Sequence, residues 1–364
     1  VGSFLISLAW RALMEKTTGM KRRADKEKPG KKTIIQQLEE DPKIYRPALL
    51  ILSAAALAFP FLFSTYQVNI MVTALMYVVL ALGLNIVVGQ AGLLHLGYAA
   101  FYAAGAYTYA LLNYHFGIGF WMALPLGGLV AALFGILLGF PVLRLRGDYL
   151  AIVTLGFGEI TRLVLENWNA FSFGPSGISG IPRPGFFGME MNLEGATIYL
   201  YFLMIALCVF TIFVIQRLQN SRIGRAWIAL REDEIACQAM GIDKTKAKMT
   251  AFALGSTWAG LVGVIFAAKT TFVNPASFTF LESAMILSMV VLGGMGSILG
   301  VALGAFILVL LPEYLRAFSD YRMLLFGVIM VIMMVFRPQG IISGIRRTYE
   351  YHGKETVKNI QPLL

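Results

Sequence analysis

The sequence predicts an all-α, polytopic membrane protein, and three observations support this fold class. Apolar residues make up 58% of the 364 residues and charged residues only 14%, whereas a soluble domain carries about 25% charge. The mean hydropathy is +0.72. Several apolar runs reach or approach the ~20 residues that a helix needs to cross the hydrocarbon core, so we expect a helical bundle of about 8–10 spans.

Basic residues define the expected orientation in the membrane. Eleven of the 30 Lys and Arg residues lie in 11–46, seven in 217–248 and five in 337–358. Because basic loops are retained in the cytoplasm, these three regions are expected on the cytoplasmic side. The net charge of +10 therefore indicates orientation in a lipid bilayer, and not nucleic-acid binding.

The chain divides into three expected regions. A basic cytoplasmic segment covers residues 1–46, a transmembrane domain covers 47–342, and a cytoplasmic tail covers 343–364. Residue 1 is Val rather than Met, which fits a first segment that is truncated. The transmembrane domain therefore carries the functional elements.

Apolar runs give the expected positions of the spans in chain order. They lie at about 47–63, 68–88, 93–112, 118–142, 149–168, 197–216, 249–269 and 323–336. Between the last two, segments 281–292 and 297–311 are open to two interpretations. Either each crosses the membrane, which gives about ten spans, or the two form one re-entrant pair.

Glycines interrupt the apolar region between these two segments. Gly293, Gly294 and Gly296 fall within four residues, a density that favours a break in a helix. Broken helices at membrane depth are tolerated where protein or a water-filled cavity satisfies the backbone. The break is therefore interpreted either as part of a translocation pathway or as a plain loop.

A loop rich in Gly and Pro spans residues 169–196, on the side opposite the basic clusters. Pro and Gly fix turns, and the apolar side chains of Ile178, Ile181, Phe186 and Phe187 favour packing against the bundle. We expect a folded external cap, and a docking surface for an external protein is the alternative.

A polar stretch at 224–241 lies between two apolar runs and predicts a short cytoplasmic helix. Three acids (Glu232, Asp233 and Glu234) open it, where the positive end of the helix dipole favours negative charge. Gly241 is placed to close it in a left-handed conformation, and Asp243 to begin the next helix. Such a helix is suited to receive a push from a soluble partner.

The sequence carries no recognisable catalytic or metal-binding set, so we do not expect an enzyme. The three His residues (His95, His115 and His352) are scattered, and Cys208 lies far from Cys237. Residues 30–33 lack the preceding Gly of a phosphate-binding loop, because Asp25 occupies its position. We expect no cofactor and no ATP site in this chain, so any ATP-driven work comes from another polypeptide.

Charged residues interrupt the expected span at 149–168. Glu159, Arg162 and Glu166 fall at i, i+3 and i+7 and share one helix face. Because an unpaired charge inside the bilayer is costly, the first interpretation is a self-neutralised structural cluster. The alternative is that Glu159 holds an ammonium group of a substrate.

Six blocks of the sequence together resemble one known family. They are the glycine- and aromatic-rich block at 147–160 and those at 174–184, 224–241, 272–280, 291–297 and 337–340. In this order they resemble the LivM-type permease subunit of bacterial branched-chain amino acid ABC transporters. The resemblance covers about residues 47–342.

The resemblance implies an assembly in the bacterial inner membrane. The family's permease pairs with a LivH-type sister permease, and two cytoplasmic ATPase subunits bind the ATP. A periplasmic binding protein delivers Leu, Ile or Val. A permease for urea or short-chain amides shares the fold and is one alternative. A motor-independent channel or ion-coupled carrier is an alternative of another class.

On this resemblance residues 232–241 form the coupling helix that fits a groove of the ATPase. The residues implied are Glu232, Asp233, Glu234, Ala236, Ala239 and Gly241. The wider importer pattern is Glu-Ala-Ala followed by Gly. This chain departs from it, because Ile235 stands at the Glu position and Cys237 at the second Ala.

A zwitterion with an apolar tail needs a pathway that joins polar groups to apolar walls. The mechanism that the resemblance implies is alternating access driven by the ATPases. The candidates for lining the pathway are Tyr98, Phe101, Tyr149, Glu159, Gly293, Gly294 and Gly296.

Overall fold

The computed structural model describes residues 56–142, 145, 147–185, 192–314, 327–328, 331 and 340–342. The chain divides into two units, Val1–Leu62 and Phe63–Leu364. Of the first unit, residues 56–62 are described and are helical. All elements below belong to the second unit.

Helix α4 (Thr65–Asn85) is the most buried long helix. It begins at a capping box formed by Ser64 and Gln67 and continues as the π-helix η1 (Ile86–Gln90). Its own side chains are mostly apolar around the whole helix, as expected for a helix inside a bundle. It packs against α9 (Leu193–Gln219), α12 (Lys244–Thr270), α13 (Phe280–Gly293) and α14 (Ile298–Tyr314).

A second group of helices packs around α12. Helices α5 (Ala99–Phe116) and α6 (Phe120–Val142) pack directly against α12, and α7 (Asp148–Asn167) packs against α5 and α6. Glycines allow the close approach, because a Cβ added at Gly105 would lie 2.1 Å from the carbonyl oxygen of Gly260. Small residues of this kind let helix backbones touch in lipid.

The segment between η1 and α5 differs from the prediction of a span at 93–112. Residues 91–98 are not helical, and α5 begins only at Ala99. Gly92 adopts a φ of +71°, which ends the helical course. The backbone N–H of Leu96 donates to Thr154 Oγ1 at 3.0 Å, so a side chain of α7 satisfies this non-helical backbone.

Helices α13 and α14 form an antiparallel hairpin that turns at residues 294–297. Added Cβ atoms at Gly300 and Gly304 would lie 2.2 Å from Gly293 O and 2.6 Å from Met289 O. The predicted interruption of this apolar region is therefore confirmed. The two helices run side by side in opposite directions, which agrees with both interpretations of the pair.

The loop after α7 folds against the bundle, as predicted for an external cap. Strand β1 (Ile178–Ser179) pairs antiparallel with β2 (Phe272–Val273), with Ile178 opposite Val273. Ile178 and Ile181 are buried. Phe186 and Phe187 lie outside the described residues. The remaining short elements are α8 (Asn169–Ser172), η2 (Gly174–Ser176) and η3 (Pro275–Ser277).

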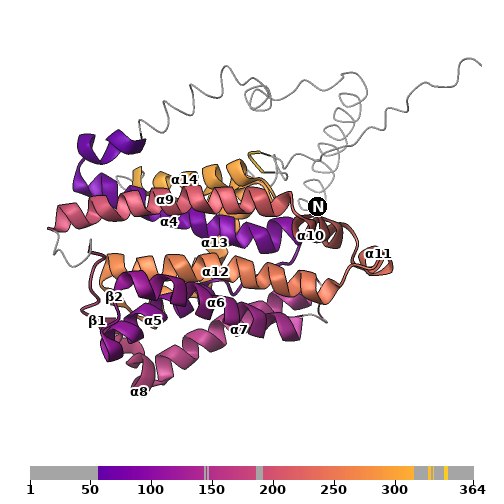
Figure 1. Cartoon of the computed structure of the whole chain (residues 1–364), viewed down its shortest axis with the longest axis horizontal. Coiled ribbons are helices and arrows are strands. Elements are labelled where there is room, and N and C mark those ends of the chain that lie inside the picture. Colours follow the sequence, from indigo (N-terminus) through magenta and orange to yellow (C-terminus); the bar gives the residue numbers. More distant parts are fainter. Residues whose placement is uncertain are drawn as a thin grey trace, which may run out of the picture. The chain divides into compact units, whose positions relative to one another are not determined.

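Two helices, α10 (Arg222–Glu232) and α11 (Glu234–Ala239), connect α9 to α12. Figure 1 shows them at the end of the bundle opposite β1 and β2. The connections of α9 and α12 require this placement, because α9 leads into α10 and α12 leads into β2.

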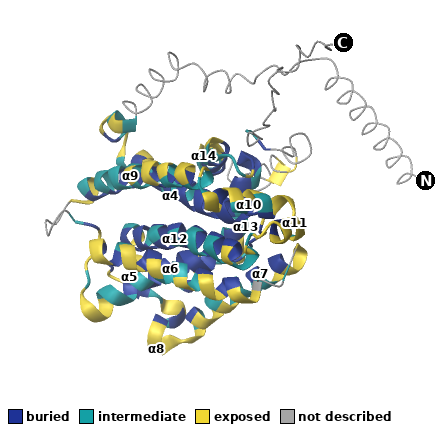
Figure 2. Cartoon of the chain, turned by 45° about the vertical axis from the view of Figure 1, so that its right-hand side comes forward, coloured by how far each residue is buried: buried dark blue, intermediate teal, exposed yellow. Residues whose placement is uncertain are grey.

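Five helices within the described part of the chain are long and apolar enough to cross a membrane. They are Thr65–Gln90, Phe120–Pro141, Leu193–Gln219, Lys244–Thr270 and Pro275–Gly293, and the apolar helix Ile298–Tyr314 is shorter. Figure 2 shows exposed residues along α7 and α9, where large apolar side chains such as Ile160 and Phe213 are accessible. The all-α, polytopic fold class is confirmed. The predicted span at 323–336 lies almost wholly outside the described residues.

Candidate functional site

The polar stretch between α9 and α12 forms two helices, separated at Asp233. Its backbone is extended (φ −155°), and its Oδ1 accepts hydrogen bonds from Ile235 N at 2.8 Å and Ala236 N at 3.0 Å. Asp233 is therefore the N-cap of α11, a position that favours Asp. Glu232 is the last residue of α10, so its predicted place in the first turn of the short helix is wrong.

The predicted end of α11 is confirmed. Gly241 has a φ of +81°, and its N–H donates to Gln238 O at 3.1 Å while Ile242 N donates to Cys237 O at 3.0 Å. This is the Schellman pattern, which Gly favours. Asp243 then caps α12, and hydrogen bonds from the backbone N–H groups of Lys246 and Thr245 lower the pKa of its carboxyl.

Buried side chains fix this pair of helices to α12. Trp227 of α10 is fully buried, and its Nε1 donates to Ala247 O at 2.8 Å. Glu234 of α11 pairs with the buried Lys248 at 2.9 Å. Such a pair, once enclosed, is costly to break. We name Trp227, Glu234, Ala247 and Lys248 the anchor of the helix pair.

Helix α11 directs small and apolar side chains outward. Ile235 and Met240 are 68% and 82% exposed, and the predicted coupling residues Ala236, Ala239 and Gly241 are also exposed. A solvent-facing apolar surface on a capped, anchored helix is typical of a docking surface. Their contact with an ATPase stays a prediction.

Arg231, near the end of α10, connects the helix pair to the interior of the bundle. Its Nη1 donates to the carbonyl oxygen of Gly89 in η1 at 2.5 Å. Carbonyls in the last turn of a helix lack intrahelical partners. A cation there also interacts favourably with the negative end of the helix dipole. The contact thus joins α10 directly to η1, the continuation of α4.

The turn between α13 and α14 packs against the same end of α4 and η1. Gly296 N donates to Asn85 Oδ1 at 2.8 Å, and Gly296 O accepts from Gln219 Nε2 at 3.4 Å. A Cβ added at Gly89 would lie 2.5 Å from Gly296 N, so the close approach requires glycine. We name Asn85, Gly89, Gln219, Arg231 and Gly296 the junction, because they join α4, α9, α10 and the α13–α14 turn.

At the predicted glycine break, other backbone groups of the protein satisfy the hydrogen bonding. Gly294 and Gly296 have φ values of +110° and +87°, which favour glycine. The carbonyls of Leu292 and Gly293 accept hydrogen bonds from Ile341 N at 2.9 Å and Ile342 N at 3.2 Å. A later segment of the chain therefore satisfies the interrupted backbone. A role of these glycines in a pathway stays a prediction.

The predicted aromatic residues fall into two separate places. Tyr98 and Phe101 are fully buried in one cluster with His95, whose ring stacks on Phe101 at 5.3 Å. The Tyr98 hydroxyl donates to Gly255 O at 2.8 Å. Tyr149, at the start of α7, is 73% exposed. The structure therefore groups the first two and separates the third, and their role in a pathway stays a prediction.

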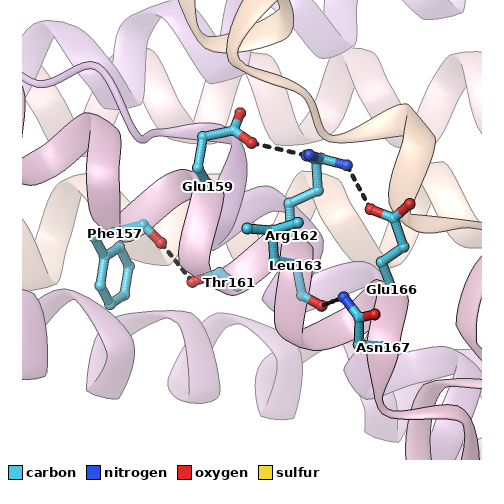
Figure 3. A network of polar contacts seen from close by, with 7 residues as sticks. All are labelled: Phe157, Glu159, Thr161, Arg162, Leu163, Glu166 and Asn167. Atoms are coloured by element: carbon cyan, nitrogen blue, oxygen red, sulfur yellow. Dashed lines mark hydrogen bonds and ion pairs between the residues drawn. The ribbon is translucent and has the colours of Figure 1, made fainter.

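The three charges of α7 form one continuous set of ion pairs (Figure 3). Arg162 Nε lies 2.9 Å from Glu159 and its Nη1 lies 2.7 Å from Glu166. The predicted pairing on one helix face is confirmed. Arg162 retains a carboxylate partner when either acid is neutralised.

We expect Glu159→Gln to leave substrate uptake and the membrane level near those of the wild type. Arg162 keeps its ion pair with Glu166 at 2.7 Å, so the change leaves no cation without a counter-charge. Glu166→Gln is the matched control, because it leaves the other pair. A loss of uptake at a normal membrane level in Glu159→Gln alone would support the ammonium-binding alternative.

We expect Asp233→Ala to weaken the association of a docking partner with α11. Loss of an N-cap costs ~1 kcal/mol, a large penalty for a helix of six residues. Asp233→Asn keeps a side-chain acceptor and should behave like the wild type in a copurification assay of ATPase subunits. Equal copurification of the Ala and Asn variants would contradict a role for this cap.

Sequence reasoning missed the junction. Arg231 lies inside a stretch that was predicted to contact a soluble partner, and its acceptor lies 142 residues earlier. Asn85 and Gln219 are isolated polar residues near the ends of apolar runs. No local spacing indicates these contacts. Only the glycine density at 293–296 marked one side of the junction.

The fold and site define a multi-pass helical membrane protein with an anchored helix pair between two spans. Residues 66–334 match the family model of the branched-chain amino acid transport system / permease component. The chain belongs to this family.

Curated relatives extend the likeness over most of the chain. The LivM permease protein of Salmonella typhimurium is 49% identical, over 90% of this chain and 82% of the relative. The LivM protein of Escherichia coli is 50% identical, over 84% and 76%. The LivH permease protein of E. coli is 23% identical, over 73% and 91%. No solved structure matches the chain.

Proposed function

We propose that this chain is the LivM-type permease subunit of an ATP-driven importer that carries Leu, Ile and Val across the bacterial inner membrane. The observation that carries the proposal is the 50% identity to the high-affinity LivM permease over 84% of the chain. The exposed, capped helix α11 supports it, because a permease without its own motor needs a docking element.

The proposed assembly contains a LivH-type sister permease, two ATPase subunits that bind ATP, and a periplasmic binding protein. Likeness to a LivH protein over 91% of that relative supports a pair of permeases with a common fold. Two related subunits around one axis are a usual arrangement for a shared pathway.

The structure suggests how a push at α11 would reach the spans. ATP-driven closure of the ATPases would move α11, and the anchor would carry the movement into α12. The junction would carry it into α4 and the α13–α14 turn. Packed elements move as units, so both routes would act together in exposing the pathway to alternate sides.

Reconstitution tests this proposal. Proteoliposomes holding this chain, the sister permease and the ATPases should accumulate labelled leucine when the binding protein and hydrolysable ATP are present. Omission of ATP, or of the ATPases, should abolish accumulation. Accumulation by this chain alone would contradict the proposal, and accumulation of urea in place of leucine would favour the alternative permease class.

A further inference from the structure

The second unit has a hollow at the end of the bundle opposite α10 and α11. A cavity of ≈ 210 Å³ lies between the first turns of α4 and α9 and the last turn of α12. Among the described residues, two cations line it, Arg183 and Lys269, together with Tyr66 and Thr197. Thr65 and Asn69 add polar groups, and apolar side chains form the rest of its wall.

Lys269 is a cation in a membrane-spanning helix that has only neutral partners. Its Nζ donates to Thr73 Oγ1 and, at 3.4 Å, to Asn69 O. No carboxylate of the described residues lies within ion-pair distance of it. An ammonium group has three donors, and a partly buried charge without a counter-charge is costly. Lys269 therefore has the capacity to bind an anionic group.

The other walls match the remaining parts of a small amino acid. Arg183 offers a guanidinium, which suits a carboxylate. Val72, Ala196 and Leu200 are buried and form an apolar wall. The Tyr66 hydroxyl donates to the carboxylate of Glu313, which brings negative charge beside the hollow, where a substrate's ammonium group would be favoured.

We propose that this hollow is an outer binding site for the α-carboxylate of the transported amino acid, held by Lys269 and Arg183. The branched side chain packs against Val72, Ala196 and Leu200. The inference rests on the proposed function and names the part of this chain that meets the substrate first. If Lys269 only fastens α12 to α4 through Thr73, it has no preference for carboxylates.

Protection of a cysteine from labelling separates these two roles. Thr197→Cys, made in a chain with Cys208→Ala and Cys237→Ala, places one thiol on the wall of the hollow. The permease pair with its ATPases is reconstituted without the binding protein and treated with a membrane-impermeant thiosulfonate. Bound leucine slows labelling by the factor 1 + [L]/Kd, or about tenfold at a concentration about ten times Kd.

The expected pattern depends on the carboxylate. Leucine should protect the thiol, whereas leucinol, which keeps the side chain and the ammonium group, should not. Lys269→Arg should retain protection, Lys269→Met should lose it, and Thr73→Val should retain it because the cation remains. Absence of protection by leucine, equal protection by leucinol, or full protection in Lys269→Met would overturn the inference.

Failure of this inference is distinguishable from failure of the proposed function. A complete transporter that accumulates leucine but shows no protection would sink the outer site alone. A complete transporter that does not accumulate leucine would sink the proposed function. If Lys269→Met does not reach the membrane, the comparison of leucine with leucinol in the Thr197→Cys chain still decides the question.

Discussion

Arg231→Ala is expected to lower ATP-driven leucine uptake about tenfold or more while the ATPase subunits still copurify. A hydrogen bond from a charged donor contributes about 1.5–3 kcal/mol, and this one joins α10 to Gly89 of η1, which continues α4. The anchor, through Trp227 and the Glu234–Lys248 pair, stays in place. Docking should therefore survive, but the transmission of movement into α4 should not.

Arg225→Ala is the matched control for Arg231→Ala. Arg225 also lies on α10, and its Nη1 also donates to a backbone carbonyl, that of Asn220 at 2.9 Å. That contact stays within the local chain, so uptake should remain near that of the wild type. Uptake and ATP hydrolysis, measured in the same proteoliposomes, give the ratio of substrate moved to ATP used. An equal ratio in the two variants would show that the junction carries no movement.

Gly105→Ala is expected to destabilise the bundle strongly. The added Cβ would lie 2.1 Å from Gly260 O and 2.6 Å from Gly260 Cα. Both are backbone atoms, so no side-chain rotation relieves the clash and α5 must separate from α12. Overpacking of this kind costs about 1–3 kcal/mol or more. The melting temperature in detergent and the membrane level should both fall.

Gly139→Ala provides the comparison on the same packing partner. Gly139 lies on α6 and faces α12, but an added Cβ would meet Met249 Cγ at 3.6 Å, an ordinary contact. Alanine favours a helix over glycine by about 1 kcal/mol, so this variant should be as stable as the wild type or more stable. A melting temperature for Gly105→Ala as high as that for Gly139→Ala would contradict the packing described for α5.

Local signals in the sequence were sufficient for several features of the fold. The length of the apolar runs indicated the helices, and the density of glycines indicated the turn at 293–297. The single residues Gly241 and Asp243 indicated the end of one helix and the start of the next. Each of these depends on residues that are close in sequence. The place of Glu232 was wrong because Asp233, one residue later, is the better N-cap and ends α10.

Long-range contacts could not be predicted in the same way. The non-helical backbone of 91–98 is stabilised by a hydrogen bond to Thr154 of α7. The last turn of η1 accepts a hydrogen bond from Arg231 of α10. A prediction from apolar composition alone therefore places a helical span across residues that are not helical. The positions of Lys269 and Arg183 around one hollow likewise depend on how α12 meets the loop after β1, which spacing does not encode.

The segment at 340–342 has a consequence for how this protein is made. Its amides complete the hydrogen bonding of Leu292 and Gly293, and Gly340 approaches so closely that a Cβ there would lie 2.4 Å from Gly294 Cα. The ribosome reaches these residues only after the hairpin has been synthesised. Until then the carbonyls of Leu292 and Gly293 lack these two amide partners, so a chain that stops before residue 340 should be less stable than the longer one.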